Sequence, residues 1–439
     1  MDKRELERRR KRLMAAMEDG GIAIVPAAPV QRRNGDVEFP YRPDSNFFYL
    51  TGFPEPEALA VLIPGRAQGQ FILFCRERDA AAEAWQGRRA GLEGACAEYG
   101  ADDAFPISDL DDILPGLLEN RARVYYTMGC NLELDQRLMG WVNQVRGRYR
   151  TGVTAPQEFV SLSHIVHEMR LLKSPQEIKL MRKAAALSAH AHRRAMAACR
   201  PGLREFQLEA ELTHEFMAGG SRATAYPSIV GGGANGCILH YTANSDVLND
   251  GDLVLIDAGA EYQGYASDIT RTFPVNGRFA PAQQAVYEVV LAAQLAAISK
   301  LIPGNHWNDP HQEAIRVLTR GLIALGVLKG HLTRLIKEEA YKPYFMHRTG
   351  HWLGMDVHDV GDYKVGNEWR MLEPGMVLTV EPGLYLKAGA KGLAKRWWNI
   401  GIRIEDDVLV TRDGHEVLSA AAPKQVEEME SWIAHGRAH

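Results

Sequence analysis

Residues 250–273 read DGDLVLIDAGAEYQGYASDITRTF, and this stretch places two carboxylates in runs that otherwise have the apolar character of buried strands. Asp257 closes the run GDLVLID, and Asp268 follows eleven positions later inside YASDITRTF. If the two runs form a β-hairpin with a turn around Gly259 and Gly264, the two acids are expected to be cross-strand neighbours, with Cβ atoms about 4.5–5.5 Å apart. Facing carboxylates in a half-buried sheet repel each other, so the pattern predicts a cation between them.

A second segment repeats this pattern further along the chain. GDLVLIDAG (residues 251–259) is echoed by GMVLTVEPG (residues 375–383): a glycine opens each run, an acid stands six positions later, and a glycine follows two positions after the acid. The acid of the second copy is Glu381, and the next strand-like run, IGIRIEDDVLV, carries Glu405. We therefore interpret the C-terminal part as two related halves, each a β-hairpin with one acid per strand.

These four acids define a candidate metal site. Two divalent cations would balance their four negative charges, and two-metal hydrolytic sites hold their ions about 3.5–4 Å apart. Ligand sets made mostly of oxygen favour manganese-type ions over metals that prefer thiolates. The alternative for each acid taken alone is a strand-end carboxylate, either in solvent or in an ion pair with Arg271 or Arg403.

Histidines near the acids are candidate nitrogen ligands. The segment FMHRTGHWLGMDVHDVG (residues 345–361) contains His347, His351 and His358, although three nearby histidines also occur on ordinary surfaces. His240, in CILHYTAN, precedes Asp257 by seventeen residues, and a single histidine beside an apolar strand is more often structural than catalytic.

The composition excludes several classes of function. The 439 residues are 46% hydrophobic and 24% charged, and the net charge of -4 provides no basic field for a nucleic-acid partner. No run of about 18 apolar residues indicates a membrane span, and the N-terminal segment lacks the apolar region of a secretory signal. The five cysteines form no CxxC pair, which is typical of reduced thiols in a cytoplasmic protein.

Two domains are predicted, over residues 1–172 and 173–439. Strand-like runs such as GIAIVPA, ALAVLIP, FILFCRE and ARVYYTM alternate with helical stretches in the first part, which favours an α/β domain. Ser174, Pro175 and Glu177 then form the cap, proline and capping-box pattern of a helix start. The boundary is placed just before this long helix.

Five fragments taken in order resemble one family. LIDAG, SDITRTF, HWLGMDVHD, LTVEPGLY and GIRIEDD are similar to segments of the pita-bread metallopeptidases, and EFPYRPDSNFFYLTGFPEPEALAVL, AWQGRRAG and IVHEMRLLKSPQEI resemble the aminopeptidase P group of that family. The resemblance covers essentially the whole chain. It implies an α/β N-terminal creatinase-like domain and an α+β pita-bread catalytic domain with pseudo-twofold repeated β-hairpins.

The resemblance also implies a ligand set for two divalent metal ions, typically manganese. Asp257 would bind one metal through both oxygens, and Asp268 and Glu405 would bridge the two metals. His351 and Glu381 would complete the coordination of the other metal.

Catalytic roles follow from the same resemblance. His240, His347 and His358 match positions that contact the substrate or the tetrahedral intermediate. Arg403 matches an arginine beside the bridging glutamate, and Glu381 matches the group that serves as general base and then general acid.

Five further residues are assigned to substrate binding by the resemblance. Asp36, Trp85 and Arg150 match residues of the N-terminal domain, or of a neighbouring subunit, near the site, and Tyr385 is assigned with them. The segment DVGDYKVGNEWRML departs from the family pattern, so an arginine expected to face the distal part of the substrate is either Arg370 or absent.

The activity implied is that of an Xaa-Pro aminopeptidase, which releases the N-terminal residue from peptides with proline in second position. The expected assembly is a homotetramer or homodimer, with peptides as partners and neither nucleic acid nor membrane. The alternatives are an Xaa-Pro dipeptidase (prolidase), which shares all five ligands, and a non-catalytic peptide-binding member of the fold, which is expected to lose ligands.

Overall fold

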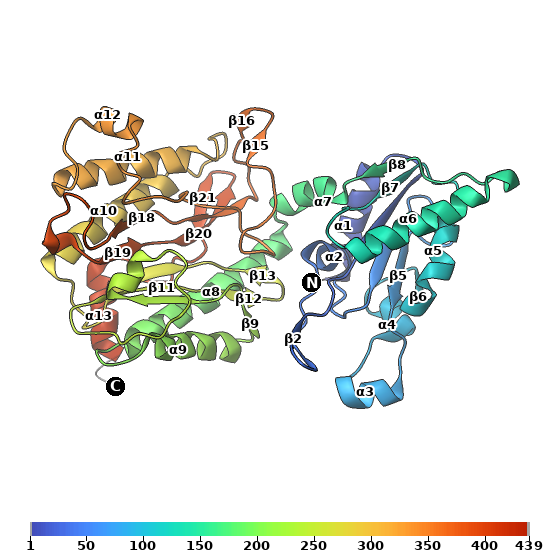
Figure 1. Ribbon diagram of the computed structural model, residues 1–439, viewed down its shortest axis with the longest axis horizontal. Helices are drawn as coiled ribbons and strands as arrows, with labels where there is room; N and C mark the ends of the chain where they lie inside the picture. Colours follow the sequence, from blue (N-terminus) through green and yellow to red (C-terminus); the bar gives the residue numbers. More distant parts are fainter. Residues whose placement is uncertain (1, 437–439) are drawn as a thin grey trace. The chain divides into compact units, whose positions relative to one another are not determined.

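The computed structural model describes residues 2–436 and divides the chain into two compact units, Met1–Met169 and Arg170–His439 (Figure 1). The sequence places the end of the first domain at residue 172, whereas the first unit ends at Met169, inside helix α7 (Leu162–Leu171). Among residues 2–436, no helix combines the length and apolar character needed to cross a lipid bilayer.

The first unit is built on a six-stranded mixed sheet with the strand order β6-β5-β4-β1-β7-β8. The four apolar runs read as strands in the sequence become β1, β4, β5 and β7, and side chains of α5 and α6, such as Leu114 and Trp141, pack against them. The strands are β1 (Gly21–Pro26), β4 (Leu59–Leu62), β5 (Phe71–Cys75), β6 (Asp103–Pro106), β7 (Arg123–Tyr125) and β8 (Glu158–Val160). The main helices are α1 (Lys3–Ala16), α2 (Ser45–Thr51), α4 (Gly91–Ala97), α5 (Leu110–Leu118) and α6 (Leu132–Gly147).

Two elements of the first unit extend from this core. The hairpin of β2 (Arg32–Asn34) and β3 (Val37–Glu38) exposes all of its side chains, and helix α3 (Ala80–Gln86) buries none of its own. Figure 1 shows both elements reaching away from the sheet of their unit.

The second unit has two helix pairs around short antiparallel sheets. Helix α8 packs against β12 and β13, α9 packs against β9 and β10, and α10 packs on β17 to β19 (Figure 1). The helices are α8 (Pro175–Ala198), α9 (Glu205–Ala218), α10 (Pro281–Ile298), α11 (Asp309–Ala324), α12 (Leu332–Lys337) and α13 (Val426–Gly436). The first-half strands are β9 (Ala223–Thr224), β10 (Ile229–Gly232), β11 (Leu253–Asp257), β12 (Ala260–Tyr262), β13 (Tyr265–Ala266) and β14 (Thr270–Pro274). The second-half strands are β15 (Lys364–Val365), β16 (Glu368–Trp369), β17 (Val377–Val380), β18 (Gly383–Leu386), β19 (Ile400–Arg403), β20 (Asp406–Thr411) and β21 (Gly414–Val417).

The start of α8 has the cap expected from the sequence. Ser174 Oγ accepts a hydrogen bond from the Glu177 backbone, and the Glu177 carboxylate accepts one from the Ser174 backbone. Pro175 occupies the first turn, where its missing N–H costs nothing.

The repeated acids lie on matching hairpins, but their registers differ. In the second half, Val380 pairs with Asp406 and Gly383 pairs with Arg403, so Glu381 and Glu405 occupy opposed positions between two ladders. In the first half, Asp257 pairs with Thr270. The expectation that Asp257 and Asp268 are directly opposed is therefore wrong.

The register of the first half has a local cause. The small hairpin of β12 and β13 is inserted after β11, and its turn is made by Gln263 and Gly264, both with positive φ. Gly259 also approaches the Ser267 carbonyl so closely that a Cβ at residue 259 would lie 1.7 Å from that oxygen. The insertion leaves Asp268 two residues ahead of β14, on the same face as Thr270.

Candidate metal centre

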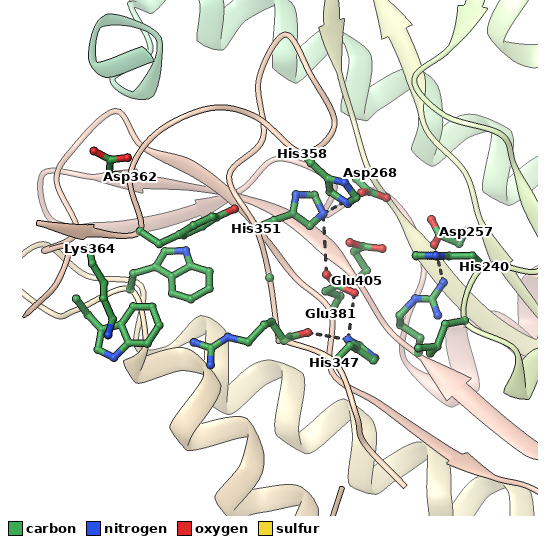
Figure 2. A pocket seen from close by; sticks show the side chains of 17 residues that line it. His240, Asp257, Asp268, His347, His351, His358, Asp362, Lys364, Glu381 and Glu405 are labelled. Atoms are coloured by element: carbon green, nitrogen blue, oxygen red, sulfur yellow. Dashed lines mark hydrogen bonds and ion pairs between the residues drawn. The ribbon is translucent and has the colours of Figure 1, made fainter. Parts of the chain in front are cut away.

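A cavity of about 850 Å³ lies in the second unit, and the predicted metal ligands line it (Figure 2). Its walls come from distant parts of the chain: the segment before β11 and the end of β11, the segment before β14, the loop between α10 and α11, the stretch from the end of α12 through β16, the turn before β18, and the end of β19 with the turn after it. The lining residues are Leu239, His240, Asp257, Asp268, Trp307, His347, Arg348, Gly350, His351, His358, Asp362, Tyr363, Lys364, Trp369, Glu381, Arg403 and Glu405.

Three of the predicted ligands form a compact donor set. One oxygen of Asp268, one oxygen of Glu405 and one ring nitrogen of His351 all lie within 4.8 Å of one another. His351 Nε2 is 3.4 Å from Asp268 Oδ2 and 3.9 Å from Glu381 Oε1. Oxygen and imidazole donors at these separations fit a divalent cation of the manganese or zinc type.

The orientation of His351 suits metal binding. Its Nδ1 lies 2.9 Å from the Trp352 carbonyl, to which an Nδ1–H donates, so that Nε2 faces the carboxylates. Two hydrogen bonds join His351 to the strand that precedes Glu381: Thr379 N donates to the His351 carbonyl, and His351 N donates to the side-chain Oγ1 of Thr379. Burial by itself would lower the pKa of His351, but the neighbouring Asp268 and Glu381 raise it to about 9.

The carboxylates carry unbalanced negative charge. Burial and the mutual repulsion of the acids raise the pKa of Asp268 and of Glu405, the latter well above its usual range, and they raise that of Glu381 to about 7. Within residues 2–436, no lysine or arginine forms an ion pair with these three acids. The chemistry of this donor set therefore fits a bound cation.

Asp257 lies on the other side of the cluster and has a cationic partner. Arg403 Nη2 donates to Asp257 Oδ2 at 2.5 Å, so one oxygen of this acid is in an arginine pair. Tyr226 OH lies 2.7 Å from Asp257 Oδ1 and 2.5 Å from Asp268 Oδ1, and it links the two carboxylates. No pattern in the sequence indicates Tyr226, which lies in the irregular segment between β9 and β10.

Hydrogen bonds hold the remaining groups in place. Thr270 Oγ1 donates to Glu405 Oε2 at 2.6 Å and lies 3.1 Å from Arg403 Nε. Arg403 Nη1 donates to Tyr385 OH at 3.0 Å, and that hydroxyl lies 2.8 Å from His347 Nε2. Tyr385 is buried and is not among the lining residues, so it contacts the site through Arg403 and His347.

The histidines differ in whether their ring nitrogens are available to hydrogen-bond a substrate. His347 is held on both sides, since Nδ1 lies 2.7 Å from the Arg348 carbonyl, and burial lowers its pKa to about 4. His240 and His358 line the cavity, and their ring nitrogens have no hydrogen-bond partner in the part of the chain that the structure describes. His358 packs edge-on against the ring of His351, with centroids 4.4 Å apart.

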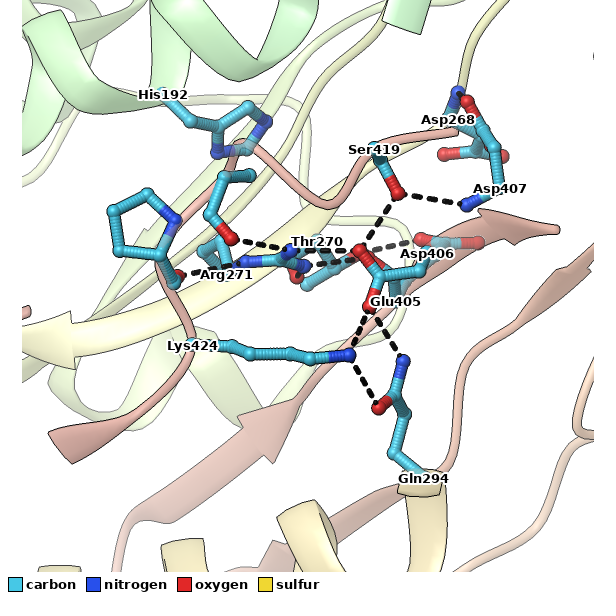
Figure 3. Close-up of polar contacts among 12 residues, drawn as sticks. His192, Asp268, Thr270, Arg271, Gln294, Glu405, Asp406, Asp407, Ser419 and Lys424 are labelled. Atoms are coloured by element: carbon cyan, nitrogen blue, oxygen red, sulfur yellow. Dashed lines mark hydrogen bonds and ion pairs between the residues drawn. The ribbon is translucent and has the colours of Figure 1, made fainter. Parts of the chain in front are cut away.

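A second polar cluster lies directly behind the ligands (Figure 3). Arg271 forms an ion pair with Asp406 at 2.7 Å and donates to the Glu405 carbonyl at 2.6 Å, rather than pairing with one of the four acids of the repeat. Both oxygens of Asp407 accept from the Asp268 backbone N–H, at 3.1 and 3.2 Å. The strand that follows Glu405, β20, is thus hydrogen-bonded to the segment that carries Asp268.

The other predicted substrate-binding residues are not in the cavity lining. Asp36, Trp85 and Arg150 belong to the first unit, where Asp36 lies in the β2–β3 turn and Trp85 is 91% exposed on α3. Arg150 contacts its neighbour Tyr149. Arg370 is joined by its backbone to Tyr363 and Trp307 and does not line the cavity.

The sequence also missed the outer wall of the cavity. Trp307 and Trp369 stack with centroids 5.4 Å apart, and Tyr363 lies 4.4 Å from Trp307. Arg348 and Lys364 lie over the tryptophan rings. These residues come from loops and from the β15–β16 hairpin, whose strands have only two residues each. Such segments are too short or too irregular to show hydrophobic periodicity.

Two family models match parts of the chain. Residues 179–412 match metallopeptidase family M24, and residues 6–126 match the aminopeptidase P N-terminal domain. The chain belongs to metallopeptidase family M24.

Relatives share the whole length of the chain. It is 45% identical over 438 residues to an Xaa-Pro aminopeptidase of Escherichia coli (strain K12), an alignment that covers 100% of this chain and 99% of the relative. A solved structure of Pseudomonas aeruginosa aminopeptidase PepP is 58% identical, with a TM-score of 0.99 and coverage of 100% of this chain and 99% of that one. A zinc-substituted E. coli aminopeptidase P in complex with product is 45% identical, with a TM-score of 0.97 and the same two coverages.

Proposed function

We propose that the protein is a metal-dependent Xaa-Pro aminopeptidase, which releases the N-terminal residue from peptides with proline in second position. The observation that carries this conclusion is the convergence of Asp268, His351 and Glu405 in a cavity where Asp268, Glu381 and Glu405 form no ion pair with a lysine or arginine of residues 2–436. The full-length similarity to Xaa-Pro aminopeptidases supports the same substrate class.

We propose further that the site holds two divalent ions, with manganese as the working metal. Asp257, Asp268, His351, Glu381 and Glu405 would hold them, and all five line the cavity. When bound, such ions polarise the scissile carbonyl and lower the pKa of the water that attacks it.

Glu381 is positioned to move the proton. Its carboxylate lines the cavity, and His347 Nδ1 lies 3.6 Å from Oε2. A carboxylate in this place takes a proton from the attacking water and returns it to the proline nitrogen as the bond breaks. The proline nitrogen needs this proton because without it the nitrogen would have to leave as a strongly basic anion.

The unpartnered histidines are suited to bind the substrate carbonyl. His240 and His358 present ring nitrogens to the cavity, and a donor there stabilises the negative charge that develops on the carbonyl oxygen. Arg403, fixed by Asp257 and Tyr385, keeps the cavity wall and one carboxylate in position.

Assembly and the first unit are part of the proposal. We expect a homodimer or homotetramer of the 48.8 kDa chain, in which Asp36, Trp85 and Arg150 contribute to substrate binding. Light scattering measures the assembly. Trp85→Ala is expected to raise KM for peptides while metal content stays unchanged, and an unchanged KM contradicts that role.

The function is tested by comparing substrates with and without metal. Purified protein is stripped with chelator, reloaded with Mn²⁺, and assayed on an Xaa-Pro dipeptide and on an Xaa-Pro-Yaa tripeptide. The proposal expects release of the first residue from the tripeptide, loss of activity on chelation and recovery on reloading. Cleavage of the dipeptide alone would identify a prolidase, and full activity without metal would contradict the metal-dependent reaction.

A further inference from the structure

The outer part of the active-site cavity contains an arginine, Arg348, that has no role in the proposed hydrolytic mechanism. Arg348 follows His347 in the sequence and lines the cavity with Trp307 and Trp369. Its guanidinium carbon is 4.9 Å from the ring centroid of Trp307 and 5.0 Å from that of Trp369. The two indoles fix the position of this cation by cation–π contact and packing.

Arg348 has no carboxylate partner among residues 2–436. Its Nη2 donates to the neutral amide oxygen of Asn308 at 2.5 Å, which orients the guanidinium without balancing its charge. Burial lowers the pKa of Arg348, and the neighbouring Tyr341 opposes this shift. The Arg348 side chain is exposed to the cavity, so its oriented guanidinium, which has no counter-ion among the described residues, is available to an anion supplied from outside the protein.

Lys364 adds a second positive charge to this wall. Its Nζ lies 4.6 Å above the ring of Trp369, and the side chain forms no ion pair in the described part of the chain. Asp362 also lines the cavity but is not ion-paired with Lys364 or Arg348. Arg348 and Lys364 against the single carboxylate of Asp362 leave the outer wall with a net positive charge.

The shape of the cavity indicates which part of a peptide reaches this wall. A second cavity of about 490 Å³ also has His347, Arg348 and Trp369 in its lining, so the two cavities adjoin at the guanidinium. An aminopeptidase that removes one residue needs room for only that residue on the N-terminal side of the cleaved bond. The longer end of the space therefore accommodates the residues after proline, each of which spans about 3.3–3.6 Å when extended.

We propose that Arg348, held between Trp307 and Trp369 and assisted by Lys364, binds a carboxylate in the peptide segment that follows the proline. This inference rests on the proposed Xaa-Pro aminopeptidase function and specifies its substrates. The guanidinium fork matches a carboxylate geometrically, and the bond is charge-assisted. The carboxylate is supplied either by the free C-terminus of a short peptide or by an acidic side chain one or two residues after the proline.

The first test compares a free tripeptide with its amide. For the wild type, an Xaa-Pro-Leu acid is expected to have a KM about tenfold lower than that of the Xaa-Pro-Leu amide, as for one charge-assisted hydrogen bond. Arg348→Leu is expected to remove this difference by raising KM for the acid, with kcat changed less than about threefold. Arg348→Lys keeps the charge but loses the fork, so it is expected to retain part of the preference.

A matched control is available in the same unit. Arg396 lies over the ring of Trp397 at 4.7 Å and lines neither cavity, so Arg396→Leu removes a similar cation–π contact elsewhere. This variant is expected to keep the wild-type preference for the acid. Loss of the preference in Arg396→Leu would contradict a specific role for Arg348.

A second set of substrates identifies the source of the carboxylate. C-terminally amidated tetrapeptides carry Glu or Gln at the first or second position after proline. A lower KM for the Glu peptides that disappears in Arg348→Leu assigns the subsite to side chains, whereas a preference confined to the free tripeptide assigns it to the C-terminus. Either result supports the proposal.

The wild type can also show equal KM values for the tripeptide acid and its amide, and for the Glu and Gln tetrapeptides. That result overturns the proposed carboxylate subsite but leaves the aminopeptidase function intact. Failure to cleave any of these peptides overturns the proposed function instead. Calorimetric titration with Pro-Leu and Pro-Leu amide then decides the subsite without turnover. Tighter binding of the acid by the wild type but not by Arg348→Leu supports it, and equal binding overturns it.

Discussion

Two adjacent residues, Glu405 and Asp406, face buried polar clusters of opposite electrostatic character. Glu405 faces other acids, and burial and their repulsion raise its pKa well above the usual range. Asp406 is also fully buried, but Arg271 and Lys424 each lie 2.7 Å from it and hold its pKa well below the usual range.

The opposite pKa shifts of Glu405 and Asp406 distinguish an acid that maintains the fold from an acid that is expected to bind a metal. The Asp406 cluster is satisfied by the folded chain itself, because Gln294 and Ser419 complete its hydrogen bonds (Figure 3). The Glu405 cluster is left with unbalanced charge, which the chain stabilises only in part through Thr270. Buried acids of the first kind maintain the fold, and those of the second kind are completed by a metal.

The largest expected effect follows from removing an acid of the cavity. Asp268→Ala is expected to lower kcat/KM by roughly 10³-fold or more and to reduce metal content, because it removes one oxygen of the three-ligand set. Metal analysis and peptide assays on the same preparation measure both quantities. A fully active and fully metallated variant would contradict the assignment.

Removing the neighbouring satisfied acid is expected to affect stability instead. Asp406→Ala leaves Arg271 and Lys424 buried without their partner, which lowers the free energy of unfolding by about 3–5 kcal/mol. Urea unfolding of the metal-free protein checks this value. The exposed turn residue Asp413 gives the control, since Asp413→Ala is expected to change stability by less than about 0.5 kcal/mol.

A pH-dependent effect is expected at a third buried acid. Asp359 lies 2.5 Å from Arg170 Nη2 and 3.0 Å from Lys173 Nζ, and although burial opposes it, these cations lower its pKa. A lowered pKa stabilises the fold above the unfolded value of about 4, and that contribution is lost as the pH falls through the folded pKa. Asp359→Asn is therefore expected to cost about 2–3 kcal/mol at neutral pH.

This difference should narrow when unfolding is measured below about pH 4, where the wild-type carboxylate also takes up a proton. A stability difference that stays constant into acid would show that Asp359 acts through packing rather than through charge.

The smallest expected effect has the opposite sign. In the metal-free protein, burial and the neighbouring acids oppose ionisation of Glu405, and Glu405→Gln removes this unfavourable titration while its amide oxygen can still accept from Thr270, so it is expected to raise the free energy of unfolding by about 1 kcal/mol. Chemical unfolding in the presence of chelator measures it. If Glu405→Gln destabilised the protein as much as Asp406→Ala, the Glu405 cluster would also be maintaining the fold, and the proposed difference between the two clusters would be wrong.

The echo between the two hairpins made much of the site predictable. Glu381 and Glu405 come together because the strands around them keep one register, and a repeated glycine–acid spacing reports that register directly. Asp257 and Asp268 were misplaced relative to each other because the inserted β12–β13 hairpin shifts the pairing. Thr270 was within reach of the sequence, since it lies two positions after Asp268 on one strand face.

Other parts of the site have no local signature. Tyr226 acts on acids 31 and 42 positions away from a segment without regular structure. Arg348 is adjacent to a predicted residue, but its surroundings are made by Trp307 and Trp369, and only the folded chain brings these together. Long-range contacts between irregular segments leave no periodic pattern to read.

The most direct test is a calorimetric titration of Mn²⁺ into chelator-treated protein, with Asp268→Ala titrated in parallel. Convergence of the five ligands predicts two ions bound per chain in the wild type and a loss of this stoichiometry in the variant. If the wild type bound no Mn²⁺, or if both proteins bound it equally, the proposed convergence of these ligands on a metal site would be contradicted.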